Sequence, residues 1–181
     1  MRTVMLSLGL VLLCLLSAEA GNATDVRLDK SKIGGKWYIL AMASDSEEYI
    51  EKKESLKVAM ANVTVLEDGD LNVSFAIPTP VRCLKFSSIY KPMDTQGNYY
   101  RTDRGNKTVQ ALATDNNTYM IVFATRVKNG KTLHMLRLYS RTEEVSSEVT
   151  DLFKELAKEK SFSEDTIWML PRQDECKLDE A

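Results

Sequence analysis

The sequence has little of several things, and each shortage excludes a class of protein. Eight glycines and four prolines in 181 residues are too few for a collagen-like or linker-like chain. Lysine and arginine number 24 against 26 aspartates and glutamates, so the basic excess of a nucleic-acid-binding protein is missing. Hydrophobic residues at 44% and charged residues at 28% are typical of one globular domain with a sizeable core.

Residue types that carry catalysis or bind metals are equally scarce. The chain has a single histidine, His134, and no group of histidine, cysteine and aspartate at metal-ligand spacing. A glycine-rich loop that could hold phosphate is also missing from the sequence. We therefore expect a protein that is not an enzyme, binds no metal directly and needs no cofactor.

The sequence contains one long apolar run, at its N-terminus. Arg2 precedes an apolar stretch over residues 5–16, and Ala18 and Ala20 occupy the −3 and −1 positions of a signal-peptidase site. The run is shorter than the ~20 residues that cross a bilayer, which disfavours a membrane anchor. We interpret residues 1–20 as a secretory signal and residues 21–181 as one extracellular domain without membrane insertion.

Removal of that signal changes the cysteine count from three to two, because Cys14 lies within it. In an oxidising compartment Cys83 and Cys176 most simply form one disulfide, closing a loop of 93 positions. The chain-entropy model gives such a crosslink about 4–5 kcal/mol of stability. Five N-glycosylation sequons agree with secretion and are candidate glycan sites, at Asn22, Asn62, Asn72, Asn106 and Asn116.

Most of the remaining chain has the pattern of short β-strands. Eight segments are rich in β-branched or aromatic residues and are mostly bounded by turn residues: 36–43, 56–66, 71–77, 84–91, 97–101, 108–113, 118–126 and 132–140. Turn sequences at 67–70, 115–117 and 129–130 indicate hairpins between neighbouring strands. From Ser147 onward the apolar period becomes helical, at Val149, Leu152, Phe153, Leu156 and Ala157. This change predicts one amphipathic helix after the strands.

Eight up-and-down strands remove their exposed edges most simply by closing into a barrel. A barrel of this size has room inside for one small ligand. A β-sandwich made of the same strands is the alternative. We therefore predict an all-β fold: an eight-stranded antiparallel up-and-down barrel with one C-terminal α-helix packed on it.

Two motifs lie at opposite ends of the predicted strand region. Gly35 and Trp37 open the first strand as a G-x-W sequence, and Arg141 directly follows the last strand. A guanidinium stacked on the indole would close one end of a barrel, and such a cation–π contact contributes ~0.5–2 kcal/mol. We expect both side chains to determine the fold and not to bind ligand.

A third motif lies between them, where Thr114 and Asp115 match the first two positions of a T-D-Y turn. In order and spacing the three motifs resemble those of the lipocalin family over nearly the whole predicted domain. Asn116 stands where that family often has an aromatic residue, but it preserves the turn chemistry. The resemblance implies a calyx, the cup-shaped barrel in which lipocalins hold a small molecule.

Basic residues in the later strands are the candidate ligand-binding groups. If Arg126 and Arg137 face inward, alternation places four residues inside with them, Val122, Ala124, Leu133 and Met135. The same alternation places Tyr119, Ile121, Phe123 and Leu138 outside. His134 alternates away from Arg137 and is therefore expected outside the barrel. Because both faces are apolar, alternation leaves open whether Arg126 ends its strand at the surface.

Residues 107–139 resemble the siderophore-binding type of lipocalin, in which one lysine and two arginines receive the ligand. The resemblance gives this role to Lys107, Arg126 and Arg137. It also places Phe86 where those proteins have a tryptophan in the wall of the calyx. A phenylalanine keeps the stacking face and lacks the indole N–H donor, so the shape or affinity of the pocket is expected to differ.

Three cations around one cavity repel one another, and an anionic ligand relieves that repulsion. The resemblance implies capture of ferric catecholate siderophores in antibacterial iron withholding, with iron bound only through the siderophore. The alternative is a carrier of fatty acids or lysophospholipids such as lysophosphatidic acid, because the same cations hold one carboxylate or phosphate. The sequence leaves open a cell-surface receptor that recognises the loops at the barrel mouth, and it leaves open the oligomeric state.

Overall fold

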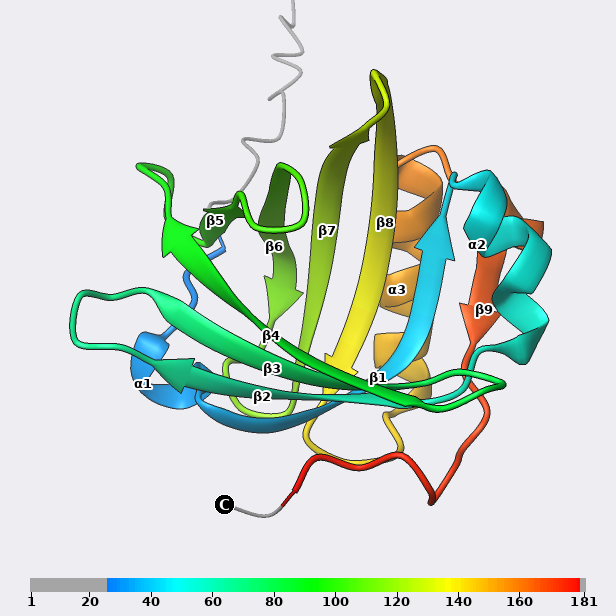
Figure 1. Ribbon diagram of the computed structural model, residues 1–181, viewed down its shortest axis with the longest axis horizontal. Helices are drawn as coiled ribbons and strands as arrows, with labels where there is room; N and C mark the ends of the chain where they lie inside the picture. The colour runs from blue at the N-terminus through cyan, green and yellow to red at the C-terminus, as the bar shows by residue number, and fades with distance from the viewer. Residues whose placement is uncertain (1–25, 180–181) are drawn as a thin grey trace, which may run out of the picture.

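The computed structural model describes residues 26–179, so the expected signal at residues 1–20 and the sequon at Asn22 lie outside the described residues (Figure 1). The strands are β1 (Gly35–Ser44), β2 (Ala59–Val65), β3 (Leu71–Pro78), β4 (Cys83–Pro92), β5 (Asn98–Arg101), β6 (Lys107–Thr114), β7 (Tyr119–Lys128), β8 (Lys131–Ser140) and β9 (Ile167–Met169). The α-helices are α1 (Lys30–Ile33), α2 (Glu47–Lys52) and α3 (Ser147–Glu159). Two short 3₁₀ turns complete the order, at Lys53–Ser55 and Glu164–Thr166.

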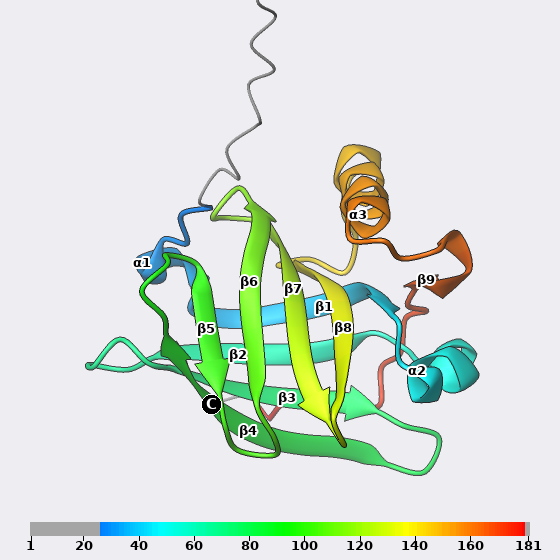
Figure 2. The same ribbon diagram turned by 90° about the horizontal axis from the view of Figure 1, so that it is seen from above.

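Strands β1 to β8 form a closed antiparallel barrel, as the sequence predicts. The strands pair in the order β2-β3-β4-β5-β6-β7-β8-β1, and a further pairing of β1 with β2 closes the ring. In Figure 2 the strands β5 to β8 run across β1 to β4, so the two halves of the barrel wall are seen one over the other. The short strand β9 was not expected, and it pairs with β1 at Ala41–Ala43. The barrel excludes the β-sandwich alternative.

Tight turns fix the register of neighbouring strands. Between β7 and β8 the two turn residues Asn129 and Gly130 both have left-handed backbone angles, with φ of 53° and 72°. Two residues of positive φ form the type I′ turn that matches the twist of a hairpin, and Asn-Gly is its preferred sequence. Lys128 therefore pairs directly with Lys131. This register decides which side chains of the two strands point into the barrel.

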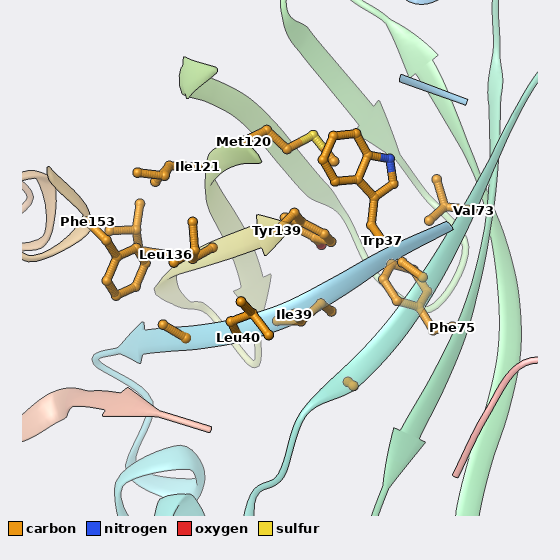
Figure 3. Close-up of a cluster of buried hydrophobic side chains, with 14 of the residues drawn as sticks. Trp37, Ile39, Leu40, Val73, Phe75, Met120, Ile121, Leu136, Tyr139 and Phe153 are labelled. Atoms are coloured by element: carbon orange, nitrogen blue, oxygen red, sulfur yellow. The ribbon is translucent and has the colours of Figure 1, made fainter. Parts of the chain in front are cut away.

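Helix α3 lies against the outside of the barrel, where the sequence predicts it. Its N-terminus is capped by Ser146, whose Oγ accepts a hydrogen bond from the Val149 amide. Phe153 is fully buried on the apolar side of the helix. Figure 3 shows its ring beside Leu136 of β8, with Ile121 of β7 nearby. The outward-facing apolar residues of β7 and β8 are therefore covered by the helix and form a core outside the barrel.

The predicted disulfide is confirmed. Cys83 at the start of β4 is bonded to Cys176 in the C-terminal segment, and their Cα atoms lie 5.1 Å apart. Cys176 is buried in a small apolar cluster with Met60 of β2 and Ala76 of β3. The bond thus holds the last described residues against the outer surface of the barrel.

The structure has two short helices that sequence patterning did not predict. Helix α1 precedes β1, and α2 follows β1 at the end of the barrel where the β7–β8 hairpin turns (Figure 1). Glu48 of α2 forms an ion pair with Lys128 at that hairpin, with 3.6 Å between Oε2 and Nζ. Helix α2 therefore forms part of the rim at this end, which we call the mouth.

Candidate functional site: a cationic calyx

The end of the barrel opposite the mouth is closed by Arg141 and Trp37. The Arg141 guanidinium carbon lies 3.7 Å from the centroid of the Trp37 ring. Its nitrogens donate hydrogen bonds to three backbone carbonyls, those of Lys32, Gly34 and Lys36, at 2.6, 2.7 and 2.8 Å. Gly35 has a φ of +92°, which a side chain rarely adopts, and it brings the chain within reach of the guanidinium. This end is therefore occupied by structural contacts.

The turn between β6 and β7 holds the second motif at the same end. Desolvation raises the pKa of the Asp115 carboxyl, but hydrogen bonds donated by Thr118 Oγ1 and by the backbone amides of residues 117–119 outweigh it and lower the pKa to about 2. Thr114 Oγ1 accepts from the Asn116 amide. Asn116 has a left-handed φ of 61°, and its side chain binds the backbone of Arg27 and Asp29. Asparagine tolerates this conformation better than an aromatic residue does, which accounts for its place here.

Above this closed end the barrel contains a cavity with mostly apolar walls. It spans about 700 Å³ of space not filled by atoms, part of it continuous with solvent. Val73 and Phe75 of β3 line one side, and Val109 of β6 and Val122 of β7 line the other. Lys107 and Arg137 are the cations among its lining residues in the described part of the chain. An apolar cavity with two cations suits a ligand that is negatively charged and otherwise aliphatic or aromatic.

A second cavity lies at the mouth and shares Lys107 and Ala124 with the first. Arg126 lines it, together with Leu133 and Met135 of β8. Since Val122 lines the inner cavity, all four residues expected inside the barrel face one of these two cavities. The structure therefore places Lys107 and Arg137 on the inner cavity and Lys107 and Arg126 on the mouth cavity, so Lys107 belongs to both.

The cations lie on neighbouring strands. Lys107 of β6 pairs directly with Arg126 of β7, and on its other side with Arg101 of β5. Directly paired residues of antiparallel strands point to the same face with Cα atoms ~4.5–5.5 Å apart. Arg137 of β8 lies deeper, because it pairs with Val122. Its Nε donates to Met135 Sδ at 3.1 Å.

This crowding of charge acts on Lys107. Burial lowers the pKa of the Lys107 ammonium well below its usual value, and the charges of Arg137, Arg101 and Arg126 lower it further. Among the described residues, no carboxylate forms an ion pair with Lys107. The calyx without ligand is therefore electrostatically unfavourable for a protonated lysine, and an anion would restore its charge.

Phe86 lies on the inner face of β4 beside Phe75, with which it pairs directly. The two ring centroids are 5.2 Å apart. The Arg104 guanidinium carbon lies 4.3 Å from the Phe86 centroid, and the Arg104 carbonyl accepts a hydrogen bond from Arg126 Nη2 at 3.0 Å. One face of the Phe86 ring is therefore already covered by the Arg104 guanidinium, and the role of Phe86 as a wall residue for ligand stays a prediction.

Sequence reasoning missed Arg101 and Arg104. Arg101 ends a predicted strand, and alternation with Tyr99, a cavity-lining residue, would have placed it inside the barrel. Arg104 lies in the turn between β5 and β6 and has a left-handed φ of 56°. No periodic pattern describes such a turn, so its contact with Phe86 could not be predicted.

The four described sequons differ in environment. Asn62 and Asn72 are partly buried within strands, and Oδ1 of Asn72 is buried without a hydrogen-bond partner among the described residues. Both polar atoms of the Asn116 side chain are hydrogen-bonded. Asn106 is exposed in the turn before β6. Glycosylation at any of them remains a prediction.

The His134 ring stacks away from the inner cavity, as alternation predicts, although the residue also borders the mouth cavity. Its ring stacks on Phe123 with centroids 5.6 Å apart, and Nδ1 lies 2.6 Å from Asp45 Oδ2. Within residues 26–179, no group of three or more histidine, cysteine, aspartate or glutamate side chains is placed to hold a metal ion. The helices of this same range are all too short or too polar to cross a bilayer.

Known proteins are similar to this chain in both sequence and fold. The chain is 45% identical to the extracellular fatty acid-binding protein of Coturnix japonica over 180 residues, 99% of each chain. It is 33% identical to the prostaglandin-H2 D-isomerase of Canis lupus familiaris over 178 residues, 93% of each chain. A solved structure described as "The Siderocalin Ex-FABP functions through dual ligand specificities" superposes with a TM-score of 0.76 at 40% identity, covering 83% of this chain and 97% of that one.

The family model described as lipocalin / cytosolic fatty-acid binding protein matches residues 34–174. That range runs from the glycine before β1 to just short of the disulfide at Cys176, so it contains the whole barrel and helix α3. The chain belongs to the lipocalin family and resembles its extracellular fatty acid-binding proteins.

Proposed function

We propose that this lipocalin is a secreted protein that captures anionic aromatic ligands in its calyx, with ferric catecholate siderophores as the leading class. The observation that carries the proposal is the set of Lys107, Arg126 and Arg137 around two adjoining cavities that share Lys107, with Lys107 lacking an ion-pair partner among the described residues. A ferric tris-catecholate has charge −3 and flat aromatic rings. Coulomb attraction and cation–π contacts with arginine both favour its binding there.

Capture of such complexes would withhold iron from bacteria, and iron would enter the protein only as cargo of the siderophore. The resemblance to a siderocalin supports this class of ligand. The extracellular name of the avian relative supports secretion, which the expected signal at residues 1–20 would direct. The same cations make the site selective for anions over neutral molecules of similar shape.

A second candidate, transport of a fatty acid or lysophospholipid, is favoured by the inner cavity. Its walls below Lys107 are aliphatic and aromatic, which suits an acyl chain, and Lys107 lies where the inner and mouth cavities meet. A carboxylate or phosphate at Lys107 would leave its tail among Val73, Val109 and Val122. The relative described as having dual ligand specificities shows that one such barrel can serve two ligand classes.

Enzyme activity is not part of the proposal, although one relative is an isomerase. Cys83 and Cys176 are bonded to each other, so neither offers a free thiol to the cavity. His134 contacts Asp45 and Phe123 on the outer side of the barrel wall. In the described part of the chain, the inner cavity is lined mainly by hydrophobic and aromatic side chains with Lys107 and Arg137, a set that suits binding of an anion.

Tryptophan fluorescence tests the two ligand classes directly. Trp37 lies inside the barrel near Val73 and Met120, two residues that line the cavity (Figure 3). A coloured ferric tris-catecholate bound above it should quench its emission saturably at micromolar or lower concentration. Absence of quenching, together with saturable binding of palmitate or lysophosphatidic acid, would replace the siderophore proposal by the carrier proposal.

A further inference from the structure

Arg101 is a buried cation on the β5 wall of the barrel, beside the ligand-binding set above, and it lines a neighbouring pocket between β4 and β5. It is 9% exposed, and its Nε is buried without a hydrogen-bond partner among the described residues. It lies directly opposite Lys107 on the neighbouring strand, and its guanidinium carbon is 6.0 Å from the ring centroid of Tyr90, which lines the inner cavity. Arg101, Lys107 and Arg126 therefore form one row of cations across β5, β6 and β7.

One side of Arg101 is held by a carboxylate. Its Nη1 donates to the backbone carbonyl of Asp103 and lies 3.3 Å from Asp103 Oδ1. Ser88 on β4 donates to the other carboxylate oxygen, Oδ2, at 2.8 Å. Asp103 itself is 43% exposed, so water competes for its oxygens. The carboxylate thus fixes the guanidinium in place and offsets part of its charge.

We propose that Arg101 is a fourth anion-binding position of the calyx, on its β5 wall, and that it selects ligands by their total negative charge. This inference rests on the proposed function, because it names what the same calyx prefers among anions. A monoanion bound at Lys107 interacts with one or two cations, and Arg101 then stays paired with Asp103. A ligand with three negative charges spreads over the whole row and interacts with Arg101 as well.

Coulomb energy is proportional to ligand charge, which gives the proposal a quantitative form. If one cation is removed at a fixed distance, the logarithm of the loss in affinity is about three times larger for a trianion than for a monoanion. At ~8 Å in a dielectric close to that of water, the losses are about 15-fold and about 2.5-fold. A residue with a purely structural role would weaken both ligands by the same factor.

The test compares Arg101→Gln with Arg172→Gln, which removes the same charge from an arginine that is 59% exposed and pairs with Glu143 and Glu144 outside the calyx. A ferric tris-catecholate of charge −3 is titrated by fluorescence quenching, and palmitate by displacement of a fluorescent fatty acid. We expect Arg101→Gln to lose about 15-fold for the first and about 2.5-fold for the second. Arg172→Gln should leave both affinities unchanged.

A second variant, Asp103→Asn, keeps the proposal testable if Arg101→Gln does not fold. It removes the counter-charge of Arg101, so affinity for the trianion should rise while affinity for palmitate changes little. Equal losses for both ligands in Arg101→Gln, or unchanged trianion affinity in either variant, would overturn the role of Arg101 alone. Failure of the unsubstituted protein to bind the ferric complex would overturn the proposed function and this inference with it.

Discussion

Replacement of Arg141 by methionine should destabilise the barrel without weakening ligand binding at its mouth. Methionine keeps much of the side-chain length but removes the cation over Trp37 and the donors to the carbonyls of Lys32, Gly34 and Lys36. Three partly exposed charge-assisted hydrogen bonds contribute about 0.5–1 kcal/mol each after solvent competition. The cation–π contact adds about 1 kcal/mol, giving a total of about 3 kcal/mol.

Urea denaturation followed by far-UV circular dichroism measures this loss as a shift of the midpoint at constant slope. Arg141→Lys keeps the charge and loses the planar fork of donors, so its loss should fall between zero and that of Arg141→Met. Arg172→Met, at an exposed position, serves as the control and should change stability by less than about 0.5 kcal/mol. A loss of under about 1 kcal/mol for Arg141→Met would refute the assignment of this residue as the closure of the barrel.

Three further outcomes follow from the same structure. Anion binding should raise the lowered pKa of Lys107, so Lys107 should take up a proton when ligand binds at alkaline pH. In calorimetry the binding heat should then change with the ionisation heat of the buffer, and this dependence should disappear in Lys107→Met. Equal heats in all buffers would contradict the expected proton uptake. Because the folded pKa of Asp115 is about 2, below its unfolded value, its stabilisation is present above pH ~4 and is lost as pH falls through the folded pKa. Asp115→Ala should therefore cost about 1 kcal/mol at pH 7, after allowance for exposure, and progressively less by urea denaturation as pH falls from ~4 towards ~2; a cost that does not change over this range would contradict the assignment. Replacing Cys83 and Cys176 by serine should lower the free energy of unfolding by about 4 kcal/mol, and an unchanged urea midpoint would argue against a stabilising crosslink.

The barrel and the helix could be predicted because their signals are local. Asn129 and Gly130 specify a two-residue hairpin by their backbone preferences alone, and the apolar spacing around Phe153 specifies a helix with one buried face. The disulfide followed from counting cysteines, once Cys14 was assigned to the signal. Each of these inferences needs only residues that are close in sequence or few in number.

The candidate site was predictable only in part. Its cations are brought together by the pairing register of strands β5 to β8, and sequence alternation alone does not give that register. Both faces of β7 are apolar, since one faces the cavity and the other faces α3, so alternation could not decide where Arg126 points. On β5, alternation from Tyr99 gives the inward direction of Arg101 but not the residue that lies opposite it. Its place beside Lys107 depends on a pairing that only the three-dimensional structure gives.

The affinity of Arg137→Glu for a ferric tris-catecholate tests most directly whether inward-facing cations hold an anionic ligand. Reversal changes two charge units at a residue that lines the inner cavity. Against a trianion at ~8 Å, even with the dielectric of water, this corresponds to about 3 kcal/mol, or more than about 100-fold in affinity. We predict that loss in a variant whose circular dichroism and urea midpoint are unchanged; a folded variant that binds within about threefold of the unsubstituted protein would contradict the account.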